Sequence, residues 1–423
     1  MIMKTRMIIA LLAVTTLVVS AHSDDVSHLD VSLSRGGQLA VNDLHVKWAA
    51  APPAERAELQ KTLDKVCAQK DCYASRLFWY TNLDQAKEAA RQSGRPILSL
   101  HLLGRLDEEL SCANSRFFRT LLYSDDAIAT ILRDQYVLHW HSVREVPRVT
   151  IELGGGRVIR QTITGNSAHY LLNENGMPLD VLPGLYSPTA FRGHLEEWTT
   201  LYRRLSRGTD IDALSRYHAE RLLETSARAL ELGIDRTPYE GVQEVWAAQM
   251  QSRSKAATEV ISLRQLKGDS RIARFFQRQR GTVAAEAQPL VDRIAVPTAP
   301  RERDVWRTIG EERKGEVVFS ESTLQLMSTK QTLTDAVLDN LRRTVAADTA
   351  FNEYDLHRRV HEWFARGEVA DLHSLNERVY DELFLTPSSD PWLGLLPEST
   401  FMGIDEPTLM VAPAPATALG GVS

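Results

Sequence analysis

Residues 77–205 constrain the fold most strongly, because helical and strand patterns alternate along this segment. A helical pattern over 83–92 ends at Gly94, and an apolar strand pattern over 97–103 follows it. Downstream we expect strands at 136–141, 149–153, 158–163, 170–172 and 179–182, and helices at 111–122, 127–133 and 191–205. Such alternation is typical of an α/β domain with helices against a central sheet.

The flanking segments have different patterns. Residues 22–76 predict an N-terminal extension that is poorly structured to about residue 53 and contains one helix over 54–69. After residue 207 helix-forming residues dominate, so we expect a mainly α-helical region over 208–400. The Ala-, Pro- and Gly-rich tail at 401–423 predicts disorder. Within 390–397, Trp392 and neighbouring leucines predict either packing on the helical region or a partner groove.

The N-terminus has the order of a signal peptide. Lys4 and Arg6 precede an apolar run over 7–19 without a charged residue. This run is shorter than the roughly 20 residues that a membrane-spanning helix needs. Cleavage after Ala21 or Ser23 is predicted, with residues 1–21 as the leader. We therefore expect a periplasmic or secreted protein with no membrane span after cleavage.

Charge argues against one class of partner. The formal net charge of the 423-residue chain is −6, and no long Lys/Arg block interrupts the sequence. Nucleic-acid binding, which depends on such basic surface, is not expected. The expected partners are protein thiols or disulfides, or a protein of the cell envelope, and we expect no cofactor.

Three cysteines leave one unpaired in an oxidising compartment. Cys67 and Cys72 are close enough in sequence to form a structural disulfide, provided that the preceding helix ends near Lys70. The alternative is a bond between Cys72 and Cys112, so the pairing stays open at this point.

Three short motifs carry a family resemblance. They are Gly-Arg-Pro-Ile-Leu at 94–98, Cys-Ala-Asn-Ser at 112–115 and Asn-Glu-Asn-Gly at 173–176. In this order and spacing, residues 77–205 resemble the thioredoxin superfamily. The resemblance implies a thioredoxin-like fold, with a central mixed sheet flanked by helices. It also implies an active site where the first core strand meets the N-terminus of a helix.

The same resemblance assigns residues to that site. Cys112 takes the position of the nucleophilic cysteine, and Ser115 replaces the resolving cysteine and is expected to hydrogen-bond the thiolate. Asn166, Ser167 and Ala168 take the place of the substrate groove, with Ser167 where redox-active members have a cis-proline. Backbone N–H groups at a helix start stabilise a thiolate. The site then predicts monothiol thiol–disulfide exchange, in which a mixed disulfide persists.

Two other hypotheses remain open. Cys112 can be a buried small hydrophobic residue, which gives a redox-inactive binding module. Alternatively, a cysteine and histidines bind copper or zinc. His139 and His141 alternate on the strand at 136–141 and are the candidates, although strand histidines also serve as hydrogen-bonded sheet residues.

Overall fold

The apolar run at 97–103 forms the central strand of a mixed sheet. The protein is described by a computed structural model at residues 33–389, except 153, 163–164, 206–209, 233, 235–307 and 385. Strand β1 (Ile97–Leu103) pairs in parallel with β2 (Val137–Arg144) and antiparallel with β5 (Ser167–Leu172). Strand β6 (Pro178–Pro183) extends the sheet antiparallel to β5, giving the order β2-β1-β5-β6. The predicted α/β class is confirmed.

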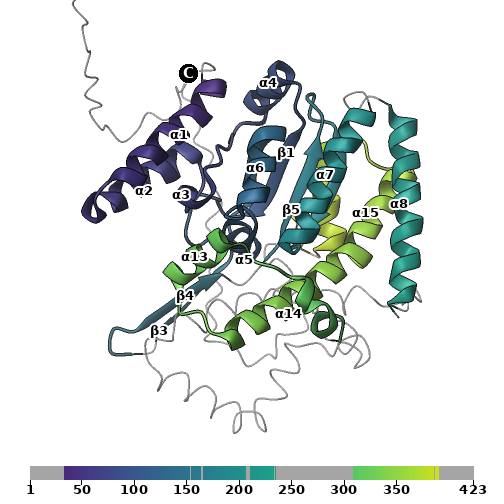
Figure 1. Cartoon of the computed structure of the whole chain (residues 1–423). Coiled ribbons are helices and arrows are strands. Elements are labelled where there is room, and N and C mark those ends of the chain that lie inside the picture. Colours follow the sequence, from purple (N-terminus) through teal and green to yellow (C-terminus); the bar gives the residue numbers. More distant parts are fainter. Residues whose placement is uncertain are drawn as a thin grey trace, which may run out of the picture.

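Every residue of β1 is buried, which requires cover on both faces of the sheet. Helices α6 (Asp126–Gln135) and α7 (Pro188–Arg204) lie in front of the sheet in Figure 1. Helix α4 (Leu83–Ser93) precedes β1 and is capped by the side chain of Asn82, which accepts hydrogen bonds from two backbone N–H groups. Gly94 ends α4 in the left-handed conformation, with φ of 68°. Asn82 and Gly94 thus set the start and the end of α4.

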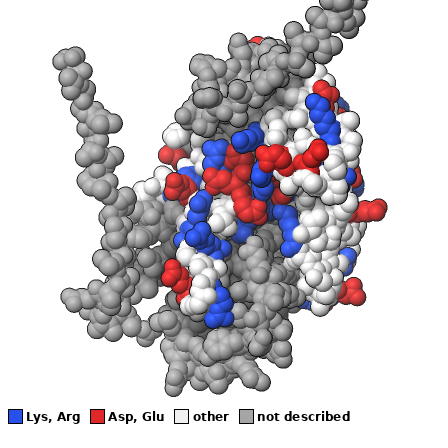
Figure 2. Space-filling model, turned by 90° about the vertical axis from the view of Figure 1, so that its left-hand side faces the viewer, with Lys and Arg blue, Asp and Glu red and all other residues white. Residues whose placement is uncertain are grey.

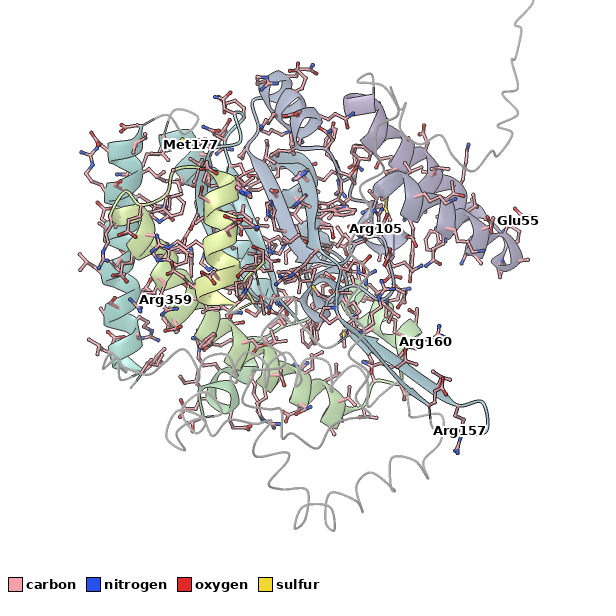
Figure 3. The ribbon with its side chains drawn as sticks, turned by 180° about the vertical axis from the view of Figure 1, so that it is seen from behind. Glu55, Arg105, Arg157, Arg160, Met177 and Arg359 are labelled. Carbon is pink, nitrogen blue, oxygen red and sulfur yellow. A yellow bond between two sulfur atoms is a disulfide. The ribbon has the colours of Figure 1, made fainter. Side chains whose placement is uncertain are left out.

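A separate hairpin of β3 (Arg148–Glu152) and β4 (Val158–Thr162) projects from the body. Figure 3 shows Arg157 at its tip and Arg160 along it, both pointing away from the sheet. The prediction of strands around the glycines at 154–156 is confirmed, because all three adopt the positive φ values that such a turn requires.

The N-terminal extension differs from its prediction. Helices α1 (Leu33–Ala50), α2 (Pro53–Cys67) and α3 (Cys72–Ser75) all form, so the expectation of a poorly structured lead-in is wrong for residues 33–50. Gly37 lies within α1, and a Cβ there would lie 2.6 Å from the ring of Phe78. The glycine permits close packing of α1 on Phe78, and this tertiary contact outweighs the low helix propensity of glycine.

The side of the molecule that carries these N-terminal helices has a mixed charge pattern. Figure 2 shows acidic and basic side chains interspersed there rather than separated into patches. The described part of this face therefore lacks a field of single sign.

In the C-terminal half, the elements that the structure describes are helices, as expected for this region. The elements are α8 (Ile211–Glu231), η3 (Lys314–Glu316), α13 (Glu321–Lys330), α14 (Asp335–Phe351), η4 (Asn352–His357), α15 (Arg358–Ala365), α16 (Leu372–Arg378) and η5 (Val379–Leu383). However, one hydrophobic cluster runs from Leu77 through Phe384 and includes residues of both halves of the chain. The helices therefore complete the core of the sheet rather than form a separate body.

Several predicted segments lie outside the described residues. They are the leader at 1–21, the Trp392 segment and the tail at 401–423. Within the described ranges, no helix has both the length and the apolar character that crossing a bilayer requires.

Candidate functional site

Cys112 lies just beyond the loop that follows β1, at the start of a helix. It is the N-cap of α5 (Ala113–Phe117), which runs directly into the π-helix η1 (Phe118–Leu122). The single α-helix predicted over 111–122 is therefore corrected: it begins two residues later and widens, with the Tyr123 N–H bonded to the Phe118 carbonyl at 2.8 Å. The wider turn accompanies burial of four of the five η1 residues.

The hydrogen-bond partner of the thiol is Ser167, not Ser115. The Cys112 Sγ atom lies 2.8 Å from the Ser167 Oγ atom. The Ser115 hydroxyl instead donates to the Ser111 Oγ atom at 2.6 Å and to the Cys112 carbonyl at 2.9 Å. The expectation that Ser115 contacts the sulfur is thus corrected, because its hydroxyl is engaged by the backbone and by Ser111.

The residues expected to line a substrate groove are covered. Cys112, Ser167 and Ala168 are each 0% exposed and Asn166 is 4% exposed. The Tyr380 hydroxyl of η5 donates to the Asn166 carbonyl at 3.2 Å, and the Asn166 Nδ2 atom donates to the Thr386 Oγ1 atom at 3.0 Å. In this structure Asn166, one of the residues predicted to form the groove, is therefore bonded to the C-terminal part of the same chain.

Further contacts fasten this segment to the sheet. The Oδ1 atom of Asn376, on α16, accepts hydrogen bonds from His101 Nδ1 at 2.7 Å and from the Tyr170 hydroxyl at 3.0 Å. The Arg144 guanidinium donates to the Pro387 carbonyl at 3.0 Å. We call residues 376–384 and 386–387 the cover segment, since Asn376 and Pro387, at its two ends, both bond to strands of the sheet.

Close packing of two backbone segments places Ser167 against Cys112. A Cβ at Gly165 would lie 3.2 Å from the Asn114 Oδ1 atom and 3.6 Å from the Ala113 Cβ atom. Glycine therefore lets the chain that leads into β5 press against the start of α5, which brings Ser167 to the thiol.

Two arginines near Cys112 were not singled out from the sequence. Arg116 is 9% exposed and donates to the Thr162 Oγ1 atom, and Arg119 is 3% exposed and donates to the Ser111 Oγ atom. Burial lowers the pKa of both guanidiniums. Among the described residues neither forms an ion pair, so positive charge is concentrated beside the sulfur. Their positions four and seven residues after Cys112 on a helix are the signal that would have found them.

Cys67 and Cys72 are joined by a disulfide, with Cα atoms 6.2 Å apart. Helix α2 ends at Cys67 because Ala68 turns into the left-handed conformation, with φ of 52°. The chain can therefore fold back so that the sulfurs meet. Cys112 is a free thiol.

The histidines proposed as metal ligands are not gathered around Cys112. His139 is buried and its Nδ1 atom lies 2.7 Å from the Ser99 Oγ atom, whereas His141 is exposed. Burial lowers the pKa of His139 to about 3, so the ring is neutral at pH 7. Within the described residues, neither histidine belongs to a set of three potential ligand atoms.

A different group of histidines lies at the β6 edge of the sheet. We call it the histidine cluster, and its members are Asp180, His194, His218, Glu353, His357 and His361. The sequence analysis missed it, although Glu353, His357 and His361 follow one another at intervals of four residues, which place side chains on one face of a helix.

Comparisons with known proteins do not assign the chain to a family. No protein-family model matches it, and no curated protein matches its sequence.

Proposed function

We propose that the protein is an exported, thioredoxin-like binding module that does not exchange thiols while its cover segment is in place. The thioredoxin-like part of the proposal is supported by the strand order β2-β1-β5-β6. It is also supported by the position of Cys112 after β1 and by its contact with Ser167, which stands where the family resemblance expects the residue that faces the cysteine. Export is supported by the leader pattern at residues 1–21 and fits the Cys67–Cys72 disulfide.

The burial of Cys112 favours a redox-inactive binding module over monothiol exchange. A thiolate must approach a disulfide sulfur of its substrate in line, which requires an accessible sulfur. Here the sulfur is fully buried, and Asn166 at the groove is already bonded to Tyr380 and Thr386. A protein disulfide therefore has no path to Cys112 unless the cover segment leaves.

Disulfide reduction by wild type and by Ser115→Cys tests the proposal. The substitution supplies a resolving thiol beside Cys112, so an accessible site would gain turnover of a protein disulfide in the presence of a reductant. We expect neither protein to exceed the rate of the reductant alone. Turnover by Ser115→Cys that is lost again in Cys112→Ser/Ser115→Cys would instead show that a protein disulfide reaches Cys112, and would overturn the closed site.

A further inference from the structure

The histidine cluster joins the two halves of the chain at the edge of the sheet. Asp180 comes from β6 and His194 from α7, whereas the other members come from α8, η4 and α15. Figure 1 shows α15 between α8 and the sheet. The four histidines and Asp180 are all at most 7% exposed, and only Glu353 is partly exposed. Such a set of buried titratable side chains from distant segments requires a physical explanation.

One triad within the cluster has the composition of a metal site. Asp180, His218 and His361 each offer one ligand atom, and these three atoms lie within 4.8 Å of one another. The Nδ1 atoms of His218 and His361 lie 2.8 Å apart and share one hydrogen in a hydrogen bond, which a metal ion would replace. Two imidazole nitrogens and one carboxylate oxygen thus converge on one point.

Hydrogen bonds from neighbouring groups orient this triad. The His218 Nε2 atom lies 2.9 Å from the Leu179 carbonyl, so Nε2 carries the hydrogen and the Nδ1 lone pair faces the other ligands. The Trp198 Nε1 group donates to the Asp180 Oδ2 atom at 2.7 Å, and the Val181 N–H donates to the Oδ1 atom at 2.7 Å, so both oxygens of the carboxylate are held in place. Metal-binding histidines and carboxylates are usually held by such outer hydrogen bonds.

A second triad of the same composition lies beside the first. His194, Glu353 and His357 also offer ligand atoms within 4.8 Å of one another, and the His194 Nε2 atom lies 2.7 Å from the Glu353 Oε2 atom. The His357 Nε2 atom lies 2.9 Å from the Asp180 Oδ1 atom and so links the triads.

The protein groups alone leave this cluster incompletely satisfied. The His357 Nδ1 and His361 Nε2 atoms are buried without a hydrogen-bond partner. The Asp180 and Glu353 carboxylates lie 2.9 Å from the His357 Nε2 atom and 2.7 Å from the His194 Nε2 atom, respectively. In the described part of the chain, no lysine or arginine forms an ion pair with either carboxylate. A cation bound between the histidines and the carboxylates would offset the negative charge of both buried carboxylates.

We propose that Asp180, His218 and His361 bind a divalent transition-metal ion, with the second triad directly beside it. Imidazole and carboxylate ligands suit Zn²⁺ or Fe²⁺, whereas Ca²⁺ and Mg²⁺ take oxygen ligands. Since the ligands come from β6, α8 and α15, the ion would clamp the C-terminal helices onto the sheet. This inference does not depend on whether Cys112 exchanges thiols.

Metal retention by tag-free, full-length protein tests the site. Protein stripped with a chelator, reloaded with Zn²⁺ and dialysed should keep at least one equivalent per chain. His218→Gln and His361→Gln should each weaken zinc binding by about tenfold or more. The matched control is His373→Gln, because His373 on α16 also lies near a glutamate but its side chain is 83% exposed. It should bind zinc as wild type does.

If the variants fail to fold, X-ray absorption of the zinc-loaded wild type still identifies the atoms that bind the metal. We expect nitrogen or oxygen ligands at about 2.0–2.1 Å together with outer-shell scattering from imidazole. Wild type that retains no zinc would overturn the proposal, because the cluster would then be an internal network of histidine–carboxylate pairs. Zinc bound through sulfur, or retained equally by a folded His218→Gln variant, would overturn it as well.

Discussion

Replacing Asn376 by alanine should open the cover segment and expose Cys112 to alkylation. The substitution removes the acceptor shared by His101 and Tyr170 and leaves two buried polar groups without it. Each such loss costs about 1–3 kcal/mol, so the lower limit for the pair is about 2 kcal/mol. If detachment of α16 exposes the thiol, the open population rises about 30-fold, because about 1.4 kcal/mol corresponds to a factor of ten.

The assay is the rate of Cys112 alkylation in native protein, followed by mass spectrometry. When reclosing is faster than alkylation, this rate is proportional to the open population. His373→Ala is the control, because it alters the same helix at an exposed position and should leave the rate within about twofold of wild type. A destabilised Asn376→Ala protein with an unchanged alkylation rate would refute the role of the cover segment.

Three further predictions concern stability. Gly37→Ala should lower the free energy of unfolding by about 1–3 kcal/mol in urea titrations, because its Cβ would clash with an aromatic ring, whereas Gly193→Ala, with open space around it, should gain up to about 1 kcal/mol. Equal effects of the two substitutions would contradict the packing argument. Removing the Cys67–Cys72 disulfide by replacing both cysteines with serine should cost about 2 kcal/mol in thermal unfolding, and an unchanged Tm would argue against the bond. Burial lowers the pKa of His169 to about 3, so the unfolded chain takes up a proton below pH 6.5 while the folded chain does not. The free energy of unfolding should therefore fall by up to about 1.4 kcal/mol per pH unit from pH 6.5 toward 3 through this residue, and His169→Gln should show a shallower dependence in urea titrations at pH 7, 6 and 5.

Local patterns predicted much of the sheet and its helices. The apolar run at 97–103 gave β1 with the same limits, since a continuous apolar strand fits only the centre of a covered sheet. Helix α4 also followed its sequence signals, with a helical pattern from residue 83 and a stop at Gly94. These features depend on neighbouring residues and are therefore readable from a short window of sequence.

The state of the candidate site depends on long-range contacts that such windows do not contain. Asn166 and its partner Thr386 are 220 residues apart in the chain. The resemblance predicted where Cys112 lies relative to β1, but not that the chain would bring its own C-terminal segment onto the groove.

The histidine cluster shows the same limit. Its helical spacing at 353, 357 and 361 is visible in the sequence, but Asp180 and His218 join only through the packing of β6 and α8. A triad contributed by three separate elements emerges only when those elements are assembled.

The number of native thiols that react with a small aromatic disulfide reagent tests the central claim most directly. Cys112 is the free cysteine, and it is fully buried. We predict no reaction of the native protein on the timescale in which a free cysteine reacts, and one equivalent per chain after denaturation. One equivalent released at once from the native protein would contradict the closed site.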